Sequence, residues 1–167
     1  VPLWDVWERF TRPLDRYKRH VTTELMPILP VGDACVVGVQ SASRGSTRWN
    51  GFWKDGVIRK KRVKAVTLAW ERHADASFRI VTTHHPLRVE HETAGDRGDV
   101  VRGQREALQA FAASKVDLVL YGHIHVPHAE IVREAGRAII LVMAGTSTSS
   151  RHRAGHTNSY NRIRLND

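Results

Sequence analysis

The chain has 167 residues, of which 41% are hydrophobic, with a net charge of +9 and a mean hydropathy of −0.38. This length predicts one domain, residues 1–167, with a sizeable core. No apolar stretch is long enough to span a bilayer and no signal or transit peptide is visible, which favours a soluble protein. The single cysteine, Cys35, excludes an internal disulfide and predicts a small core residue in a reducing compartment, the cytoplasm.

The first forty residues predict short helices, a loop and a strand. Aromatic and apolar residues recur at roughly helical spacing between 4 and 19, and Pro13 interrupts them, which predicts short helices with a bend. Two prolines and Gly32 predict a loop over residues 27–32. The apolar, β-branched residues 34–39 predict a buried strand.

Residues 40–55 are rich in serine, glycine, arginine and tryptophan, which predicts a long loop. An arginine such as Arg44 could hold a phosphate, while an aromatic ring stacks on a base. The alternative is a solvated loop whose tryptophans pack onto the core, and we favour it because tryptophan is rarely left exposed. The residues concerned are Arg44, Arg48, Trp49, Asn50 and Trp53.

Residues 56–73 predict an amphipathic helix. Val63, Val66 and Trp70 form its apolar face. The opposite face carries five cationic residues: Arg59, Lys60, Lys61, Arg62 and Lys64. Such a run could bind a polyanion, but a solvated helix face is the commoner outcome. The pI near 10.4 likewise suits anionic partners, phosphorylated substrates ahead of nucleic acid.

Two apolar strands end in histidines. Residues 78–83 run into His84, His85 and Pro86, and residues 118–121 run into Gly122, His123 and His125. The 39 residues from His84 to His123 leave room for a crossover helix, so two parallel strands would deliver both clusters to the same sheet edge.

The predicted strand ends give the imidazoles a common direction. Extended geometry would point His123 and His125 to the same side, and Gly122 would let the backbone turn or approach a neighbour. Neutral imidazoles that converge on one point suit Zn, Mn, Fe or Ni.

The segments around these strands complete the pattern. Residues 87–98 are polar and predict a rim of the site, in which His91 is more plausibly exposed than a ligand. Asp99 is a candidate cap for a helix with a buried stripe formed by Val101, Leu108, Phe111 and Ala112. Residues 129–133 and 138–143 predict a hairpin, and residues 159–165 predict a last strand.

The motifs Thr-His84-His85-Pro86-Leu87 and Asp117-Leu-Val-Leu-Tyr-Gly122-His123-Ile124-His125 together resemble the carboxyl-terminal half of a calcineurin-like metallophosphoesterase. The resemblance extends from about Val36 to Leu165. It implies an α/β fold, half of an α/β/β/α four-layer sandwich, with a mixed β-sheet flanked by helices. Each half of the family domain contributes one of two facing sheets.

The resemblance also implies a metal site. Family members hold two divalent ions (Mn, Fe, Zn or Ni), bridged by an aspartate and a water. By analogy, His84 and His123 would bind one ion and His125 the other. His85 would orient a ligand or cap its strand.

The family's earlier motifs, Asp-x-His, Gly-Asp-x-x-Asp and Gly-Asn-His-Asp or Glu, are absent from this sequence. We therefore expect the chain to be the carboxyl-terminal half of a domain. The catalytic histidine that protonates the leaving group would lie in the missing amino-terminal half. That half, or a second copy of this chain, would cover the apolar sheet face.

These implications predict a metal-dependent hydrolase of a phosphodiester or phosphomonoester, acting on a phosphorylated small molecule or nucleotide, with this chain inactive alone. Two alternatives remain. A non-catalytic fragment or scaffold could keep the fold without the reaction, or three histidines could hold a single catalytic zinc with water as the fourth ligand.

Overall fold

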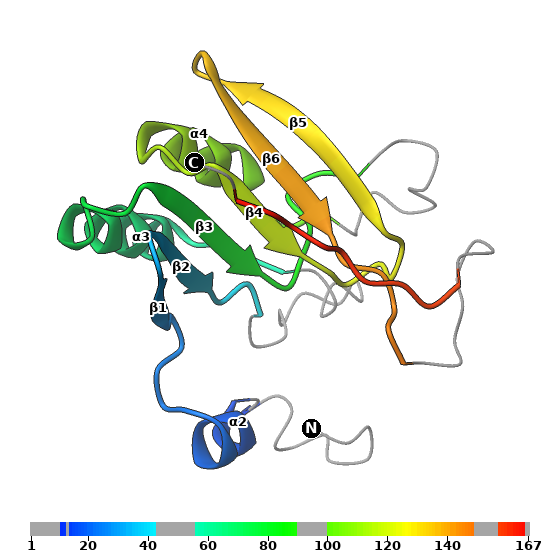
Figure 1. Ribbon diagram of the computed structural model, residues 1–167. Coiled ribbons are helices and arrows are strands. Elements are labelled where there is room, and N and C mark those ends of the chain that lie inside the picture. The colour runs from blue at the N-terminus through cyan, green and yellow to red at the C-terminus, as the bar shows by residue number, and fades with distance from the viewer. Residues whose placement is uncertain (1–10, 13, 43–55, 90–99, 149–156, 166–167) are drawn as a thin grey trace.

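The computed structural model describes residues 11–12, 14–42, 56–89, 100–148 and 157–165, and within them the chain forms one six-stranded mixed sheet. The strand order is β1-β2-β3-β4-β6-β5 (Figure 1). The inner strands β2, β3, β4 and β6 run parallel, whereas the edge strands β1 and β5 pair antiparallel. The strands are β1 Ile28–Val31, β2 Ala34–Val39, β3 Phe78–Thr83, β4 Leu118–Tyr121, β5 His128–Glu134 and β6 Arg137–Met143.

Two helices form crossovers between the parallel strands. Helix α3 (Lys60–Arg72) connects β2 to β3, and α4 (Gln104–Ala113) connects β3 to β4. Their buried side chains join one face of the sheet in the main core. This arrangement confirms the predicted parallel crossover and the α/β fold. A shorter helix, α2 (Asp15–His20), precedes the sheet and has no buried residue.

The predicted core residues are largely where the periodicity places them. Val66 and Trp70 of α3 are buried, and Val63 packs against them. Cys35 on β2 is buried and reduced, and desolvation, followed by the charge of Asp75, raises the pKa of its thiol. The prediction of a small core cysteine is therefore confirmed.

Three predictions of local structure are wrong. The helix begins at Lys60 and not at 56, because Ile58 donates its N–H to the Arg102 carbonyl at 3.0 Å and the segment is extended there. Residues 28–31 form an edge strand where a loop was expected, and an edge tolerates Pro30. Residues 159–165 form no strand: Asn161 instead donates its side-chain amide to the Met143 carbonyl at 3.0 Å.

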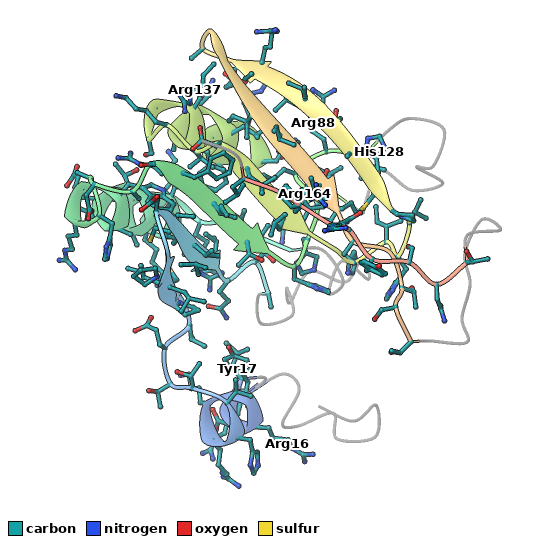
Figure 2. The ribbon with its side chains drawn as sticks, in the orientation of Figure 1. Arg16, Tyr17, Arg88, His128, Arg137 and Arg164 are labelled. Carbon is teal, nitrogen blue, oxygen red and sulfur yellow. The ribbon has the colours of Figure 1, made fainter. Side chains whose placement is uncertain are left out.

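The two ends of the parallel strands differ in their side chains. At the amino end, Arg137 donates to the Asp117 carboxylate at 2.6 Å, and Asp117 also accepts the backbone N–H of Arg79. Figure 2 places Arg137 at the end of the hairpin remote from His128. The carboxyl end carries histidines, which are described below.

A row of aliphatic side chains crosses the second face of the sheet. Pairing places Leu29, Val36, Ile80, Leu118, Ile140 and Ile131 side by side, one from each strand. The centre of the row is buried, but Leu29 is 59% exposed and Ile131 66% exposed. Helices α3 and α4 pack on the opposite face, and the middle of the row, Val36, Ile80 and Leu118, belongs to a separate and smaller apolar cluster.

Some predictions fall on residues 1–10, 43–55 and 90–99, which lie outside the described residues. They include the helical pattern around Trp4, the pocket role of Arg44 and its loop, and the roles of His91 and Asp99. Among the residues that are described, no helix has both the length and the apolar composition needed to cross a membrane.

Gly103 begins α4 in a left-handed conformation, with φ of 85°. A Cβ at this position would overlap the Ile58 carbonyl. We expect Gly103→Ala to lower the free energy of unfolding by about 1–3 kcal/mol, because alanine resists positive φ and the backbone carbonyl cannot move freely. Denaturant unfolding monitored by circular dichroism measures the change.

Gly122→Ala is the matched control. Its φ is not positive, and no described atom lies within 4 Å of an added Cβ. The change in unfolding free energy should stay within about 0.5 kcal/mol. Equal losses in both variants would contradict this account of Gly103.

Candidate metal centre

The carboxyl ends of the four parallel strands meet at one edge of the sheet. Ser41 follows β2, His84 and His85 follow β3, His123 follows β4, and Thr146 follows β6. The backbone N–H of Gly122 donates to the His84 carbonyl at 3.1 Å, which continues the pairing of β3 with β4 one step beyond the strands. The edge of the sheet therefore holds the polar residues in a fixed relation.

Three imidazole rings gather at this edge. Nε2 of His84 lies 3.1 Å from Nδ1 of His123, and the ring centroids of His84, His85 and His123 are 4.6–5.0 Å apart. Among the described residues these three form a group whose candidate ligand atoms lie within 4.8 Å of one another. The predicted approach of the two strand ends thus brings His84 and His123 together.

The spacing of these nitrogens fits a metal ion. Zinc–imidazole bonds of about 2.0–2.1 Å place two ligands of one ion about 2.8–3.4 Å apart, for right-angled to tetrahedral geometry. The 3.1 Å between His84 and His123 falls within this range. Imidazole nitrogens also suit several other first-row divalent ions.

His85 is held from two sides. It is 6% exposed, and its Nδ1 lies 2.7 Å from Oγ of Ser41. The same hydroxyl oxygen accepts the backbone N–H of His85 at 3.2 Å. A Cβ on Gly56 would overlap the imidazole ring, so only glycine leaves room for the ring in this position. A polar partner at one ring nitrogen orients the other, as is usual for metal-ligating histidines.

The backbone after β4 is not extended. His123 and His125 have φ of 80° and 67°, in the left-handed region, so the expected extended arrangement of the two histidines is wrong. Between and after them, Ile124 and Val126 are buried and anchor this segment in the core. Non-glycine residues held in this region often mark functional sites, because the surrounding structure must offset the strain.

His125 has a different partner. Its Nδ1 lies 3.0 Å from Oγ1 of Thr146, and it is outside the group formed by His84, His85 and His123. Ser41, Gly56 and Thr146 were not singled out in the sequence. The available signal was weak: Ser41 and Thr146 are small hydroxyl residues that closely follow an apolar strand.

The protein lowers the pKa of His84. Desolvation is the larger cause and the charge of His125 the smaller, although part of the residue is exposed by surface area. A neutral imidazole is the form that binds a metal ion. His84 therefore stays in its ligand form to a lower pH than an isolated histidine.

This pKa shift predicts how the stability of the metal-free protein depends on pH. Below about 6.5 the unfolded chain takes up a proton that folded His84 resists, so the free energy of unfolding should fall as the pH drops through that value. Unfolding in EDTA between pH 7.5 and 5 measures this. His84→Gln should flatten the dependence, whereas His20→Gln, on exposed α2, should retain it; a steep dependence in both would contradict the assignment to His84.

The chain is similar to several solved structures, among them two with a TM-score of 0.42. A Staphylococcus aureus protein described as a 5'-nucleotidase, in complex with alpha-ketoglutarate, is 20% identical, with 75% of this chain and 24% of that chain covered. GAP50, described as the anchor in the inner membrane complex of Plasmodium, is 16% identical, with 81% of this chain and 40% of that chain covered. The chain thus spans well under half the length of either.

Sequence comparison identifies the family. No curated protein matches the chain in sequence. The sequence profile of the calcineurin-like phosphoesterases matches residues 2–127, most of the chain, including both histidine motifs. The mixed sheet with flanking helices agrees with that match. This chain therefore belongs to the calcineurin-like phosphoesterase family.

Proposed function

We propose that this chain supplies the histidine ligands of a dinuclear metal centre that hydrolyses a phosphodiester or phosphomonoester. The observation that supports it most is the 3.1 Å approach of His84 Nε2 to His123 Nδ1, at the edge where four parallel strands end. Ligands of α/β proteins commonly bind beyond the carboxyl ends of such strands. Membership of a phosphoesterase family adds the reaction class.

In this proposal His84 and His123 hold one ion and His125 holds the second. The distance between the first two nitrogens suits a shared ion. His125 is outside their group, yet it lies near enough for its charge to lower the pKa of His84. A second ion next to the first could therefore take His125 as its ligand. The bridging carboxylate and the acid that protonates the leaving group would come from the amino-terminal half of the domain.

The residues around the ligands hold the imidazoles in position. When bound, divalent ions activate a water as the nucleophile and neutralise the phosphoryl oxygens. Thr146 fixes the ring of His125 through Nδ1, and Ser41 fixes that of His85. Because His85 is buried beside His84, it limits the orientations that the His84 ring can adopt. We therefore assign His85 a positioning role.

A single zinc ion is the second candidate. His84, His85 and His123 form a group of three whose ligand atoms lie within 4.8 Å, and three protein ligands with an open fourth position are typical of catalytic zinc. The two proposals differ in the role of His85 and in the number of ions bound. A scaffold that has lost the reaction is the third candidate. It would bind neither a pair of ions nor a single zinc ion tightly.

The apolar row on the second sheet face supports a covering partner. Exposed aliphatic patches of this kind commonly mark interfaces. We propose that the amino-terminal half of the domain covers the row, and that a second copy of this chain does so when that half is absent. The single buried cysteine supports a reducing compartment, the cytoplasm.

The first test measures metal binding and hydrolysis together. In the complete product of the gene, His123→Ala should weaken Mn²⁺ binding by about 10–100-fold and reduce hydrolysis of a chromogenic phosphodiester at least as much, because an ion loses a ligand. Calorimetric titration also counts the ions. His20→Ala, at an exposed histidine of α2 outside the group of three, is the matched control.

Two ions per chain, with His85→Ala milder than His123→Ala, would support the dinuclear proposal. One ion, with equal losses from His84, His85 and His123 variants, would favour the single zinc. The 167-residue chain alone should hydrolyse the substrate far more slowly than the complete product. Equal rates from both would contradict the proposal that the other half supplies ligands.

The covering partner predicts self-association of the 167-residue chain in isolation. Ile131→Lys should shift that chain toward the monomer, because a charge in the apolar row opposes burial of the face. Sedimentation velocity measures the shift. Val21→Lys, at an equally exposed valine outside the sheet, should leave the association unchanged. A chain that is monomeric without either substitution would contradict the proposal.

A further inference from the structure

A basic cavity lies between residues near α2, the segment after β2 and the start of α3. Its volume is about 450 Å³, within the range of small-molecule sites. Asp15 is the one carboxylate among its described lining residues, and it is 4.0 Å from a guanidinium. The cationic residues that line the cavity are Arg12, Lys18, Arg59, Lys61 and Arg62.

The start of α3 contributes three of these cations against local preference. Arg59 is the N-cap residue, and a guanidinium has no acceptor for the free N–H groups of the first turn. Lys60, Lys61 and Arg62 follow, and no acidic residue occurs in that turn. Cations are unfavourable at the positive end of a helix dipole, whereas an anion is favourable there. A bound anion would offset both features.

Arg62 lies within this concentration of positive charge. Desolvation, followed by the charge of Arg59, lowers the pKa of its guanidinium. Within the described residues its partners are neutral oxygens and not carboxylates: the Gln40 carbonyl, Gln40 Oε1 at 2.6 Å and the Val57 carbonyl at 3.4 Å. The positive charge of Arg59 thus acts on Arg62, whose hydrogen-bond partners among the described residues are neutral.

The cavity and the histidines share one stretch of backbone. Gln40 and Ala42 line the cavity, and Ser41 between them contacts His85 at 2.7 Å. The Val57 N–H donates to the Ser41 carbonyl at 2.7 Å, and Gly56, before Val57, lies against the His85 ring. Residues 40–42 therefore contribute both to the cavity and to the wall of the histidine site.

We propose that this cavity binds the additional phosphate groups of a substrate that carries two or three phosphates, a small-molecule polyphosphate ester such as a nucleoside polyphosphate. This inference rests on the proposed function for the position of the phosphate that reacts. Each phosphate carries roughly one to two negative charges, which a small group of cations can match. Guanidinium groups add paired hydrogen bonds to phosphate oxygens.

The test uses the complete gene product in EDTA, so that metal-dependent binding does not contribute. Isothermal titration calorimetry at fixed ionic strength measures the affinity for inorganic tripolyphosphate and for orthophosphate. Tripolyphosphate should bind more tightly. The double variant Arg59→Gln/Lys61→Gln should weaken tripolyphosphate binding at least tenfold.

Lys60→Gln/Lys64→Gln is the matched control, because it removes the same charge from the same helix at residues that do not line the cavity. It should change the affinity less than twofold, and both variants should keep the circular dichroism spectrum and melting temperature of the parent. Equal losses from the two variants would overturn the proposal in favour of a general charge effect.

Two further measurements separate the possible outcomes. A twelve-residue oligothymidylate that binds more tightly than tripolyphosphate, and loses affinity in the cavity variant, would overturn the proposal in favour of single-stranded nucleic acid. His123→Ala should leave tripolyphosphate binding in EDTA unchanged, although it weakens Mn²⁺ binding when EDTA is absent. If the protein binds tripolyphosphate but does not bind Mn²⁺ through the histidines, only the dinuclear function is rejected. If it binds Mn²⁺ through the histidines but does not bind tripolyphosphate in the cavity, only the cavity proposal is rejected.

Discussion

The parallel pairing of β3 with β4 is the constraint on which the site depends. Thr82 pairs with Leu120, and the Gly122 N–H donates to the His84 carbonyl two residues further along. Strands β3 and β4 therefore end next to each other at the same edge of the sheet. A shift of one residue in either strand would turn its side chains to the opposite face. The main core favours that register, because a shift would move Val81 and Val119 out of this core, in which both are fully buried, and onto the face of the smaller cluster.

The site is therefore a consequence of the core, and neighbouring polar groups refine it. Ser41 and Gly56 confine His85, while Thr146 holds His125 away from the group of three. Arg62 bonds to the Gln40 and Val57 carbonyls and so joins the two segments that carry Ser41 and Gly56. One guanidinium thus connects the lining of the basic cavity to the wall of the histidine site.

Sequence periodicity predicted the features that depend on regular structure. The parallel strands ending at His84 and His123 follow from short apolar runs, and the apolar face of α3 follows from a repeat of 3.6 residues. The hairpin before Met143 follows from two strand-like segments on either side of a turn. What it missed depends on tertiary contact. Pairing with Arg102 delays the start of α3, and the left-handed backbone of His125 redirects its ring. A lone serine such as Ser41 carries no pattern, so its contact with His85 emerges only from the fold.

The central claim is that His84 and His123 bind the same metal ion. Anomalous diffraction from crystals of the complete gene product soaked in Zn²⁺ tests it most directly. The account predicts a zinc peak about 2.0–2.1 Å from both His84 Nε2 and His123 Nδ1. Zinc peaks that are all remote from these two nitrogens, or an intact His84–His123 hydrogen bond with no zinc beside it, would contradict the account.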